Sequence, residues 1–469
     1  MNWLNYQINK NSDKLFIKEG LSGYSFFDVY EMVKVYSQTL ANLGIKYNDK
    51  VLICLPSGIG MVEVILSCFE IGVIAVPISM DMTENERRII VDKIKPALII
   101  TNWSGKELFS NSSYLLSCIE ELPNTSRGCS VIDNKYKKEN QDVCAIILTS
   151  GTSSIPKAVK LTYGNFEMSC SNWNNFLDFK QTDQFLCCLP VNHIGGLAVI
   201  IRALIYGFSV NLLSDFDAKN VKVTIQKNPV SIISLVPTML RRVLLIEDGL
   251  DSLKSLRYIL LGGGPAPESL LDYCIENRLP IVKVYGMTET CSGTFGLKVL
   301  DEPYNKLYAG RPFLGVNVWI ENKTIHISGG VVMDGYLDGL DANGVHDSHD
   351  LGRLDGDLLF LDIRRKDLIV SGGKNINPIE IEEQLMNIEG VLDSAVIGKE
   401  DEEWGQKVIA FIVIESDGFS ELEIKNKLKE KISSHKIPKE FVRLPEIPRN
   451  ELGKIIYRKL NNLYQFVSH

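Results

Sequence analysis

The stretch from Thr149 to Lys157 reads TSGTSSIPK and has the residue types that an anion-binding loop needs. The apolar run 144–148 precedes it, which predicts a buried strand that ends in a loop rich in hydroxyl and backbone N–H donors. Gly151 leaves room for phosphate oxygens to approach the backbone, and Lys157 adds a positive charge. The loop is not of the GxxxxGK[ST] type, because its lysine follows a proline and no Ser or Thr comes next. We predict a phosphate-binding loop, and the alternative is a flexible surface turn.

Length and composition limit the classes of protein. A chain of 469 residues is too long for one hydrophobic core, so we expect two or more domains. The formal charge of −8, without a long Lys/Arg run, argues against nucleic-acid binding. Ten cysteines without a CxxC pair predict buried thiols in a reducing compartment, and hence a cytoplasmic protein. The polar N-terminus and the apolar stretches interrupted by Glu63, Glu70 or Arg202 predict neither a signal peptide nor a membrane span.

The elements that must position the loop alternate between short buried strands and helices. Strands are predicted at residues 50–55, 73–76, 97–101, 185–189, 209–213, 232–236, 258–261 and 281–285, and a helix at 24–43. This alternation predicts parallel βαβ units, and short alternating pieces after residue 322 predict a small antiparallel sheet. The last hundred residues combine two helical and two strand patterns. We therefore predict an α/β fold with a large N-terminal domain, residues 1–364, and a small mobile C-terminal α/β domain, residues 365–469.

Six stretches follow one another in the order and spacing of the acyl-adenylate-forming (AMP-binding) superfamily, which includes acyl-CoA ligases and peptide-synthetase adenylation domains. They are TSGTSSIPK, LLGGGPAP (260–267), YGMTET (285–290), Asp350 in SHDLGR, IRRKDLIVSGG (363–373) and PRNELGK (448–454). In local detail the chain looks most like the members that act on o-succinylbenzoate, through LLGGGPAP, YGMTETCS, SLVPTML and LPVNHIGGLAVIIRALIYGFSV. The resemblance implies that a carboxylate joins the α-phosphate of ATP, and that the thiol of CoA then attacks the acyl-adenylate. It also implies a small domain that rotates between these two half-reactions.

The resemblance assigns roles to individual residues. Lys454 would neutralise charge where the carboxylate meets the α-phosphate, Thr288 would donate to that phosphate, and Glu289 would bind Mg²⁺. Without the other motifs, Lys454 would be interpreted as an exposed lysine in a tail. The nucleotide-binding residues implied are Thr149, Ser150, Gly151, Thr152, Ser153, Lys157, Gly263, Gly264, Pro265, Tyr285, Gly286, Asp350 and Arg364. Tyr285 offers a flat face for adenine, and Asp350 and Arg364 would bind the ribose.

Three further features have competing interpretations. Lys366 occupies the position about which the small domain of the superfamily swivels, although a surface charge run is the alternative for RRKD. His193 would border the acyl pocket and could bond an acid with a second carboxylate, or it could be a satisfied core histidine. The histidines and aspartates at 346–350 could be drawn as a metal cluster, but such loops are common.

The chain departs from the superfamily pattern at several positions. Ser153 and Ser154 replace the usual second Thr and Gly of the phosphate loop, and Ala158 replaces a common Gly. The familiar Thr-Gly-Asp is Ser348-His349-Asp350, and residues 321–330 lack the expected Gly-Glu pair. These changes affect the ribose side of the predicted site more than the reaction class.

We predict an ATP-dependent acid:CoA ligase that uses ATP, Mg²⁺ and coenzyme A, with 2-succinylbenzoate as the acid and menaquinone-type naphthoquinone biosynthesis as the pathway. One alternative is a ligase of the same superfamily that acts on another aryl or fatty acid or loads a carrier protein. The other is a nucleotide-binding module that has lost catalysis, against which the presence of Lys454, Glu289 and Lys157 speaks. We expect small-molecule partners and no nucleic acid. The sequence is compatible with a homodimer but does not determine the oligomeric state.

Overall fold

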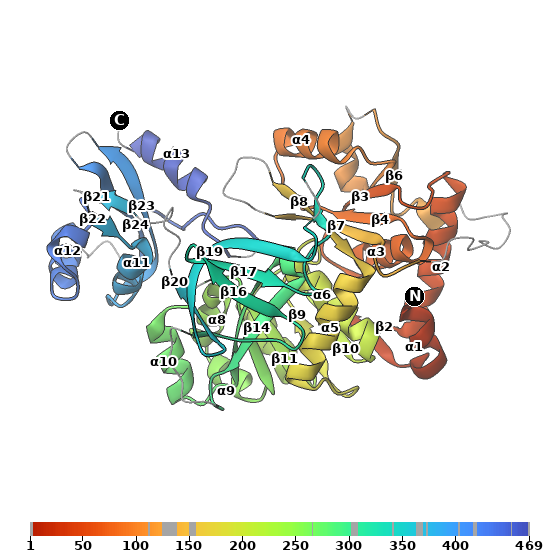
Figure 1. The fold of residues 1–469 in the computed structure, drawn as a ribbon, viewed down its shortest axis with the longest axis horizontal. Helices are drawn as coiled ribbons and strands as arrows, with labels where there is room; N and C mark the ends of the chain where they lie inside the picture. The colour runs from red at the N-terminus through yellow and green to blue at the C-terminus, as the bar shows by residue number, and fades with distance from the viewer. Residues whose placement is uncertain are drawn as a thin grey trace.

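The structure is a computed structural model that describes residues 3–110, 113–123, 138–149, 156–264, 266–301, 308–339, 342–362, 369–371, 374–401, 404–415, 420–451 and 453–467. In this part of the chain the strands form three sheets, of thirteen, seven and five strands. Figure 1 shows the five-stranded sheet, in blue, at one end of the long axis, and the seven-stranded sheet toward the other end. The predicted α/β fold with a large N-terminal part and a small C-terminal part is confirmed.

The seven-stranded sheet carries the predicted phosphate loop. Its strands, in spatial order, are β18 (Gly335–Tyr336), β8 (Lys157–Thr162), β7 (Val143–Thr149), β4 (Ile74–Pro77), β3 (Lys50–Cys54), β5 (Leu98–Thr101) and β6 (Leu116–Cys118). The strands from β7 to β6 pair in parallel, and β8 pairs antiparallel with both β7 and β18. The loop after Thr149 therefore joins two neighbouring antiparallel strands, and Thr149 and Lys157 face each other across the ladder.

The thirteen-stranded sheet changes from parallel to antiparallel along its width. Its strands, in spatial order, are β16 (Asn317–Glu321), β17 (Thr324–Ser328), β19 (Val345–Asp355), β20 (Leu358–Asp362), β15 (Tyr308–Pro312), β14 (Ser292–Lys298), β13 (Ile281–Met287), β12 (Tyr258–Leu261), β11 (Ile232–Leu235), β9 (Gln184–Cys187), β10 (Ser209–Leu212), β1 (Leu15–Glu19) and β2 (Ser22–Ser25). The strands from β13 to β1 pair in parallel, while those from β13 to β16 pair antiparallel. The predicted antiparallel piece is present, and β15 joins it to the parallel part.

Helices fill the space around these sheets. Their bounds are α1 (Trp3–Asn11), α2 (Phe26–Asn42), α3 (Ile59–Ile71), α4 (Glu84–Ile94), η1 (Trp103–Phe109), α5 (Tyr163–Leu177), α6 (Ile194–Tyr206), α7 (Ala218–Lys227), α8 (Pro237–Leu244), α9 (Gly249–Lys254), α10 (Glu268–Glu276) and η3 (Thr288–Thr290). Helices α3 and α6 are apolar almost all round, so they are buried in the main core rather than lying on its surface. Among the described residues, no helix is long and apolar enough to cross a membrane.

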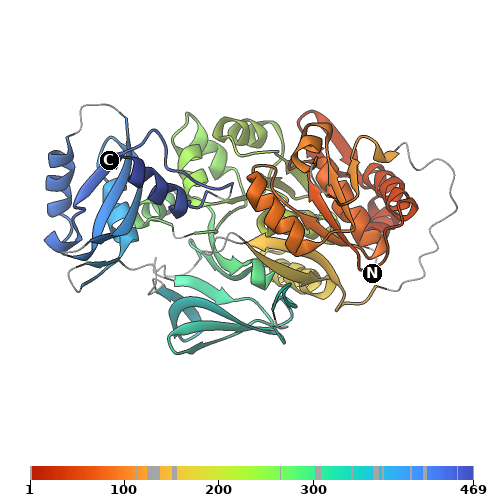
Figure 2. The same cartoon turned by 90° about the horizontal axis from the view of Figure 1, so that it is seen from above.

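The small C-terminal unit has its own core. It consists of β21 (Ile369–Ser371), β22 (Lys374–Ile376), α11 (Pro378–Met386), β23 (Val391–Asp401), β24 (Gly405–Ile414), α12 (Glu421–Lys429), η5 (Ser434–Lys436), β25 (Glu440–Arg443) and α13 (Tyr457–Val467). Two clusters of buried apolar side chains lie wholly within these residues. Figure 2 shows the unit at one end of the ribbon, beside the rest of the molecule. The predicted boundary at residues 364 and 365 lies outside the described residues and stays a prediction.

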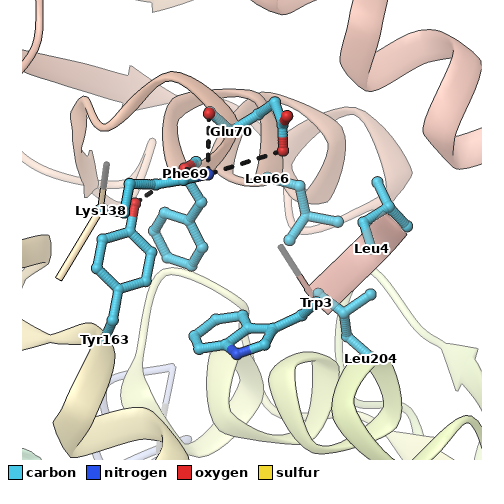
Figure 3. Close-up of a pocket in the computed structure, with 8 residues that line it drawn as sticks. All are labelled: Trp3, Leu4, Leu66, Phe69, Glu70, Lys138, Tyr163 and Leu204. Carbon is cyan, nitrogen blue, oxygen red and sulfur yellow. Dashed lines mark hydrogen bonds and ion pairs between the residues drawn. The ribbon is translucent and has the colours of Figure 1, made fainter. Parts of the chain in front are cut away.

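A small cavity near the N-terminus, of about 20 Å³, is lined by Trp3, Lys138 and Tyr163 among others (Figure 3). The ammonium of Lys138 donates to the carbonyls of Phe69 and Glu70, each at 2.9 Å, at the C-terminal end of α3. A positive charge there complements the helix dipole. A cavity of this size holds about one water molecule and is too small for a substrate. We therefore assign this cluster to the stability of the fold rather than to substrate binding.

Candidate active site

The motif YGMTET runs from the end of β13 into the short η3 turn. The hydroxyl of Tyr285 donates a 2.8 Å hydrogen bond to Asp350 Oδ2 on β19, so two residues predicted to bind the nucleoside lie side by side. Gly286 sits at a bulge in the β13–β14 pairing, where a Cβ would come within 2.2 Å of the Ser292 carbonyl oxygen. Only glycine fits this position without a backbone shift. The bulge redirects the chain before Thr288 and Glu289.

Glu289 is connected to the phosphate loop through a tyrosine that the sequence analysis missed. Tyr336, on β18, donates a 2.9 Å hydrogen bond to Glu289 Oε1. The ammonium of Lys157 lies 4.7 Å from the centre of the same tyrosine ring. Burial, together with the nearby Glu289 carboxylate, raises the pKa of Tyr336, so its hydroxyl remains a donor. The predicted metal ligand and the predicted phosphate lysine therefore flank one ring. No motif marked Tyr336, because its place depends on the pairing of β18 with β8.

The turn Ser348-His349-Asp350 explains why glycine is usual at its centre in the superfamily. His349 has a φ of 55°, in the left-handed region that favours glycine. Asp347 supports it, because its carboxylate accepts from the His349 backbone N–H at 2.8 Å and lies 3.1 Å from the imidazole Nδ1. The Ser348 hydroxyl accepts from the Asp350 N–H at 3.1 Å. The departure from Thr-Gly-Asp therefore keeps the turn and keeps Asp350 beside Tyr285.

His346 is a buried histidine next to the same site. Burial lowers its pKa, and the positive charge of Lys157 acts in the same direction, while Glu289 opposes both. At neutral pH His346 is therefore an uncharged neighbour of Glu289 and Lys157. Among the described residues, no group of three or more His, Cys, Asp or Glu could hold a metal ion by itself. The metal cluster weighed for residues 346–350 is not present in the part of the chain that the structure describes.

The glycine run after β12 and the hairpin that carries Lys454 meet at one valine. Gly263 has a φ of 82°, and a Cβ there would lie 3.0 Å from a methyl of Val236. Gly453 has a φ of 71°, and its Cβ would lie 2.9 Å from the other Val236 methyl and 2.8 Å from the Thr238 hydroxyl. Both loops therefore approach the start of α8 so closely that only glycine is accommodated. Gly264 is exposed beside them.

Lys454 belongs to a short hairpin of the C-terminal unit, which we call the lysine hairpin (residues 449–451 and 453–455). The carbonyl of Lys454 accepts from the Asn450 N–H at 2.8 Å, and its N–H donates to Asn450 Oδ1 at 2.9 Å. The side chain of Lys454 is exposed. The hairpin is thus defined by its own backbone, and the close approach of Gly453 to Val236 places it against the large unit.

His193 caps the start of α6, and its side chain reaches the lysine hairpin. Its Nε2 lies 3.4 Å from Glu451 Oε2, and the imidazole is 19 % exposed. It is therefore neither a fully buried core histidine nor isolated. The proposed border of the acyl pocket at His193 stays a prediction.

Several predicted site residues lie outside the described part of the chain. They are Ser150, Gly151, Thr152, Ser153, Pro265, Arg364 and Lys366. Ser154, one of the departures from the superfamily pattern, also lies there.

Arg202 is a buried cation that the sequence analysis did not assign to the site. It lies in α6, two turns beyond His193, and is 3 % exposed. It donates to the Ser292 hydroxyl, and its guanidinium lies 4.4 Å from the Trp173 ring centre. Its Nε has no hydrogen-bond partner among the described residues. Burial lowers its pKa to about 10, and the titratable groups nearest to it are thiols and a phenol rather than carboxylates. A single charge inside the apolar run 194–206 was the signal in the sequence.

The comparisons to known proteins agree with the fold. Residues 4–337 match the AMP-binding enzyme family, and residues 380–454 match the AMP-binding enzyme C-terminal domain. The chain therefore belongs to the AMP-binding enzyme family.

Among its relatives, 2-succinylbenzoate–CoA ligase of Bacillus cytotoxicus is 34 % identical over 99 % of this chain and 98 % of its own. The structure is similar to o-succinylbenzoate CoA synthetase of Bacillus subtilis in complex with its acyl-adenylate intermediate, with a TM-score of 0.88 and 30 % identity over 98 % and 97 % of the two chains. The complex of that synthetase with ATP and magnesium also has a TM-score of 0.88, with 29 % identity over 98 % and 99 % of the chains.

Proposed function

We propose that this chain is an ATP-dependent ligase that joins 2-succinylbenzoate to coenzyme A and releases AMP and pyrophosphate. In the first half-reaction a carboxylate oxygen bonds to the α-phosphorus of ATP, and the bond to pyrophosphate breaks. In the second, the CoA sulfur attacks the acyl carbon, AMP leaves, and the thiol proton is released. The observation that carries the proposal is the meeting of Gly263 and Gly453 at Val236. It brings Lys454, from the end of the chain, to the loops that carry the predicted nucleotide residues.

The roles of the site residues follow from their charges and neighbours. Lys454 stabilises negative charge between the carboxylate and the α-phosphate, and Lys157 stabilises the departing pyrophosphate. Glu289 fits a Mg²⁺ ligand, because the hydrogen bond from Tyr336 uses only part of the capacity of its carboxylate. The ion, bound with ATP, neutralises phosphate charge. Asp350 accepts from the ribose hydroxyls and is held in place by Tyr285.

A second carboxylate on the acid matches the unusual environment of Arg202. A buried guanidinium without a carboxylate partner is costly, and an anionic group of the substrate would compensate it. 2-Succinylbenzoate carries two carboxylates, so one can react while the other is recognised. We propose that Arg202, supported by Ser292, provides this recognition. Replacement of Arg202 by Met is expected to raise KM for 2-succinylbenzoate at least tenfold and to leave KM for ATP within about twofold.

The proposal includes the domain division and the hinge that the sequence predicts. The large domain comprises residues 1–364 and the small domain residues 365–469, with Lys366 as the hinge between them. We place the enzyme in the cytoplasm, because the nine cysteines of the described residues are all free and buried. A menaquinone-type pathway follows from the proposed acid. A homodimer remains an open expectation.

Exchange of labelled pyrophosphate into ATP, measured across a panel of acids, tests the proposal. We expect exchange that depends on 2-succinylbenzoate, and CoA consumption that follows it. Exchange only with a mono-carboxylic aryl or fatty acid would identify a different ligase of this family. Acyl transfer to a carrier protein but not to CoA would change the acceptor. Binding of ATP without exchange for any acid would mean that catalysis has been lost.

A further inference from the structure

The lysine hairpin is tied to its own unit by an arginine. Arg449 makes a two-pronged ion pair with Asp393 on β23, with Nε and Nη2 donating at 3.1 and 2.8 Å. Its Nη1 donates to the Gly453 carbonyl at 2.8 Å. These contacts stay within the C-terminal unit, so they would travel with it in any rotation. They fix the shape of the hairpin but not its place in the active site.

Glu451, in the same hairpin, bonds across to the large unit. Its Oε1 accepts from the Ser79 hydroxyl, and its Oε2 lies 3.3 Å from Asn192 Nδ2 and 3.4 Å from His193 Nε2. Ser79 follows β4 of the seven-stranded sheet, whereas Asn192 and His193 precede α6, next to β9 of the thirteen-stranded sheet. One carboxylate therefore joins the C-terminal unit to both sheets of the large unit.

We propose that Glu451 is a positioning residue that holds the C-terminal unit in the arrangement where Lys454 serves adenylation. The inference rests on the proposed two-step function. Three donors from two separate segments converge on one carboxylate, and they can do so only while the hairpin is inserted between the sheets. The Glu451 side chain is 26 % exposed, so the contact can reopen to water without burying an unpaired charge.

The electrostatics of Glu451 agree with this assignment. Burial acts to raise its pKa, but the hydrogen bonds from His193, Ser79 and Asn192 outweigh burial and lower the pKa. The inserted hairpin thus presents Glu451 as a carboxylate, the form that binds these donors most strongly. The neighbouring backbone of Gly453 packs on Val236 and Thr238. The hydrogen bonds of Glu451 to Ser79, Asn192 and His193, which we call the latch, therefore act close to this backbone contact.

Single-turnover measurement of the two half-reactions tests the latch. For Glu451→Gln we expect adenylation, followed as pyrophosphate release, to slow by roughly tenfold or more, because hydrogen bonds to a charged group are lost. Transfer of the acyl group from preformed acyl-adenylate to CoA should stay within about twofold of the unmodified enzyme. Glu446→Gln is the matched control, because Glu446 is an exposed glutamate just before the hairpin, and both rates should be unchanged.

A second variant keeps the test informative if Glu451→Gln perturbs the fold. Ser79→Ala removes one donor from the large unit and should slow the same half-reaction by a few fold, with no further loss when it is combined with Glu451→Gln. Equal loss of both half-reactions in Glu451→Gln, or full additivity of the two changes, would overturn the latch. If the unmodified enzyme itself failed to adenylate any acid, the proposed function would fail instead, and the two failures are thereby distinguished.

Discussion

The side chains that the proposal places around the nucleotide belong to strands of the large unit or to the turn after one. We call this set the nucleotide side: Lys157, Tyr285, Glu289, Tyr336 and Asp350. Lys454, by contrast, stands on a hairpin of the small C-terminal unit. The nucleotide side is tied together by side-chain contacts between segments far apart in the chain, such as Tyr285 to Asp350 and Tyr336 to Glu289. The hairpin meets the large unit through Glu451 and the close approach of Gly453 to Val236.

This difference distinguishes contacts that must last through both half-reactions from contacts that must break between them. The adenosine and the α-phosphate stay bound through both half-reactions, so the residues proposed to hold them, such as Tyr285 and Asp350, benefit from a continuous, hydrogen-bonded sheet. In the proposed mechanism, the charge of Lys454 is needed only while the carboxylate meets the α-phosphate. A few polar contacts at a partly exposed boundary can hold the lysine hairpin in the active site and can still be broken when the small unit moves. Variants on the two sides should therefore fail in different ways.

The largest effect is expected from Lys454→Ala. Loss of one oriented charge that stabilises the transition state typically costs about 2.7 to 4 kcal/mol, so adenylation should fall by roughly a hundredfold or more. Thioester formation from supplied acyl-adenylate should continue. Single-turnover release of pyrophosphate measures the first step, and a nearly normal rate of that step would show that Lys454 is not the stabilising charge.

A smaller effect is expected from Glu289→Gln, on the nucleotide side. An amide oxygen is a weaker ligand for a hard cation than a carboxylate, so the Mg²⁺ concentration for half-maximal activity should rise about tenfold. Activity measured over a Mg²⁺ titration provides the test. Glu268→Gln, on the separate helix α10, serves as the charge-matched control. An unchanged Mg²⁺ dependence would remove Glu289 from the metal site.

Tyr336→Phe probes the link between Glu289 and Lys157. The change deletes one hydrogen bond to a carboxylate but keeps the ring beneath the Lys157 ammonium. We expect a loss of roughly three- to tenfold, because such bonds contribute about 1.5 to 3 kcal/mol and water can replace part of this one. Steady-state rates at saturating ATP give the measurement. An unaltered rate would indicate that the tyrosine only fills space.

A change in stability rather than in rate is expected from a buried carboxyl group of the C-terminal unit. Burial raises the pKa of Glu382 from about 4.5 to about 8, although the Val396 N–H and Arg449 oppose this. A raised folded-state pKa stabilises the fold below the ordinary pKa, and this contribution is lost as the pH rises through about 8. The free energy of unfolding should therefore fall between pH 5 and 8 by at most about 1.4 kcal/mol per pH unit. In Glu382→Gln the dependence of the free energy of unfolding on pH should be weaker. Denaturant titrations at several pH values measure it, and an unchanged dependence would show that Glu382 is not its cause.

The sequence predicted those helices and strands whose spacing of apolar residues is visible within the element itself. The predicted strands of the large unit and the helix α2 appear close to their predicted bounds, because buried strands and amphipathic helices carry their own periodicity, whereas the short parallel strand β6 was not predicted. The site motifs were found through their order along the chain. Their mutual contacts, such as Tyr285 with Asp350, could not be predicted from spacing alone.

What the sequence did not reveal depends on contacts between distant segments. Tyr336 reaches Glu289 only because β18 pairs with β8, and nothing near Tyr336 in the chain indicates that pairing. Glu451 lies within a recognised motif, yet its partners follow β4 and β9. Arg202 did leave a signal, a lone charge in an apolar helix, which was used only to exclude a membrane span.

The most direct test of the account compares both half-reactions in Lys454→Ala and Tyr285→Phe under single-turnover conditions. Pyrophosphate release reports adenylation, and CoA consumption from preformed acyl-adenylate reports thioester formation. The account predicts that Lys454→Ala slows only adenylation, whereas Tyr285→Phe, which removes the hydrogen bond to the ribose-binding Asp350 on the nucleotide side, slows both steps by similar factors. Equal slowing of both steps by Lys454→Ala would contradict it, because the lysine hairpin would then be a permanent part of the site.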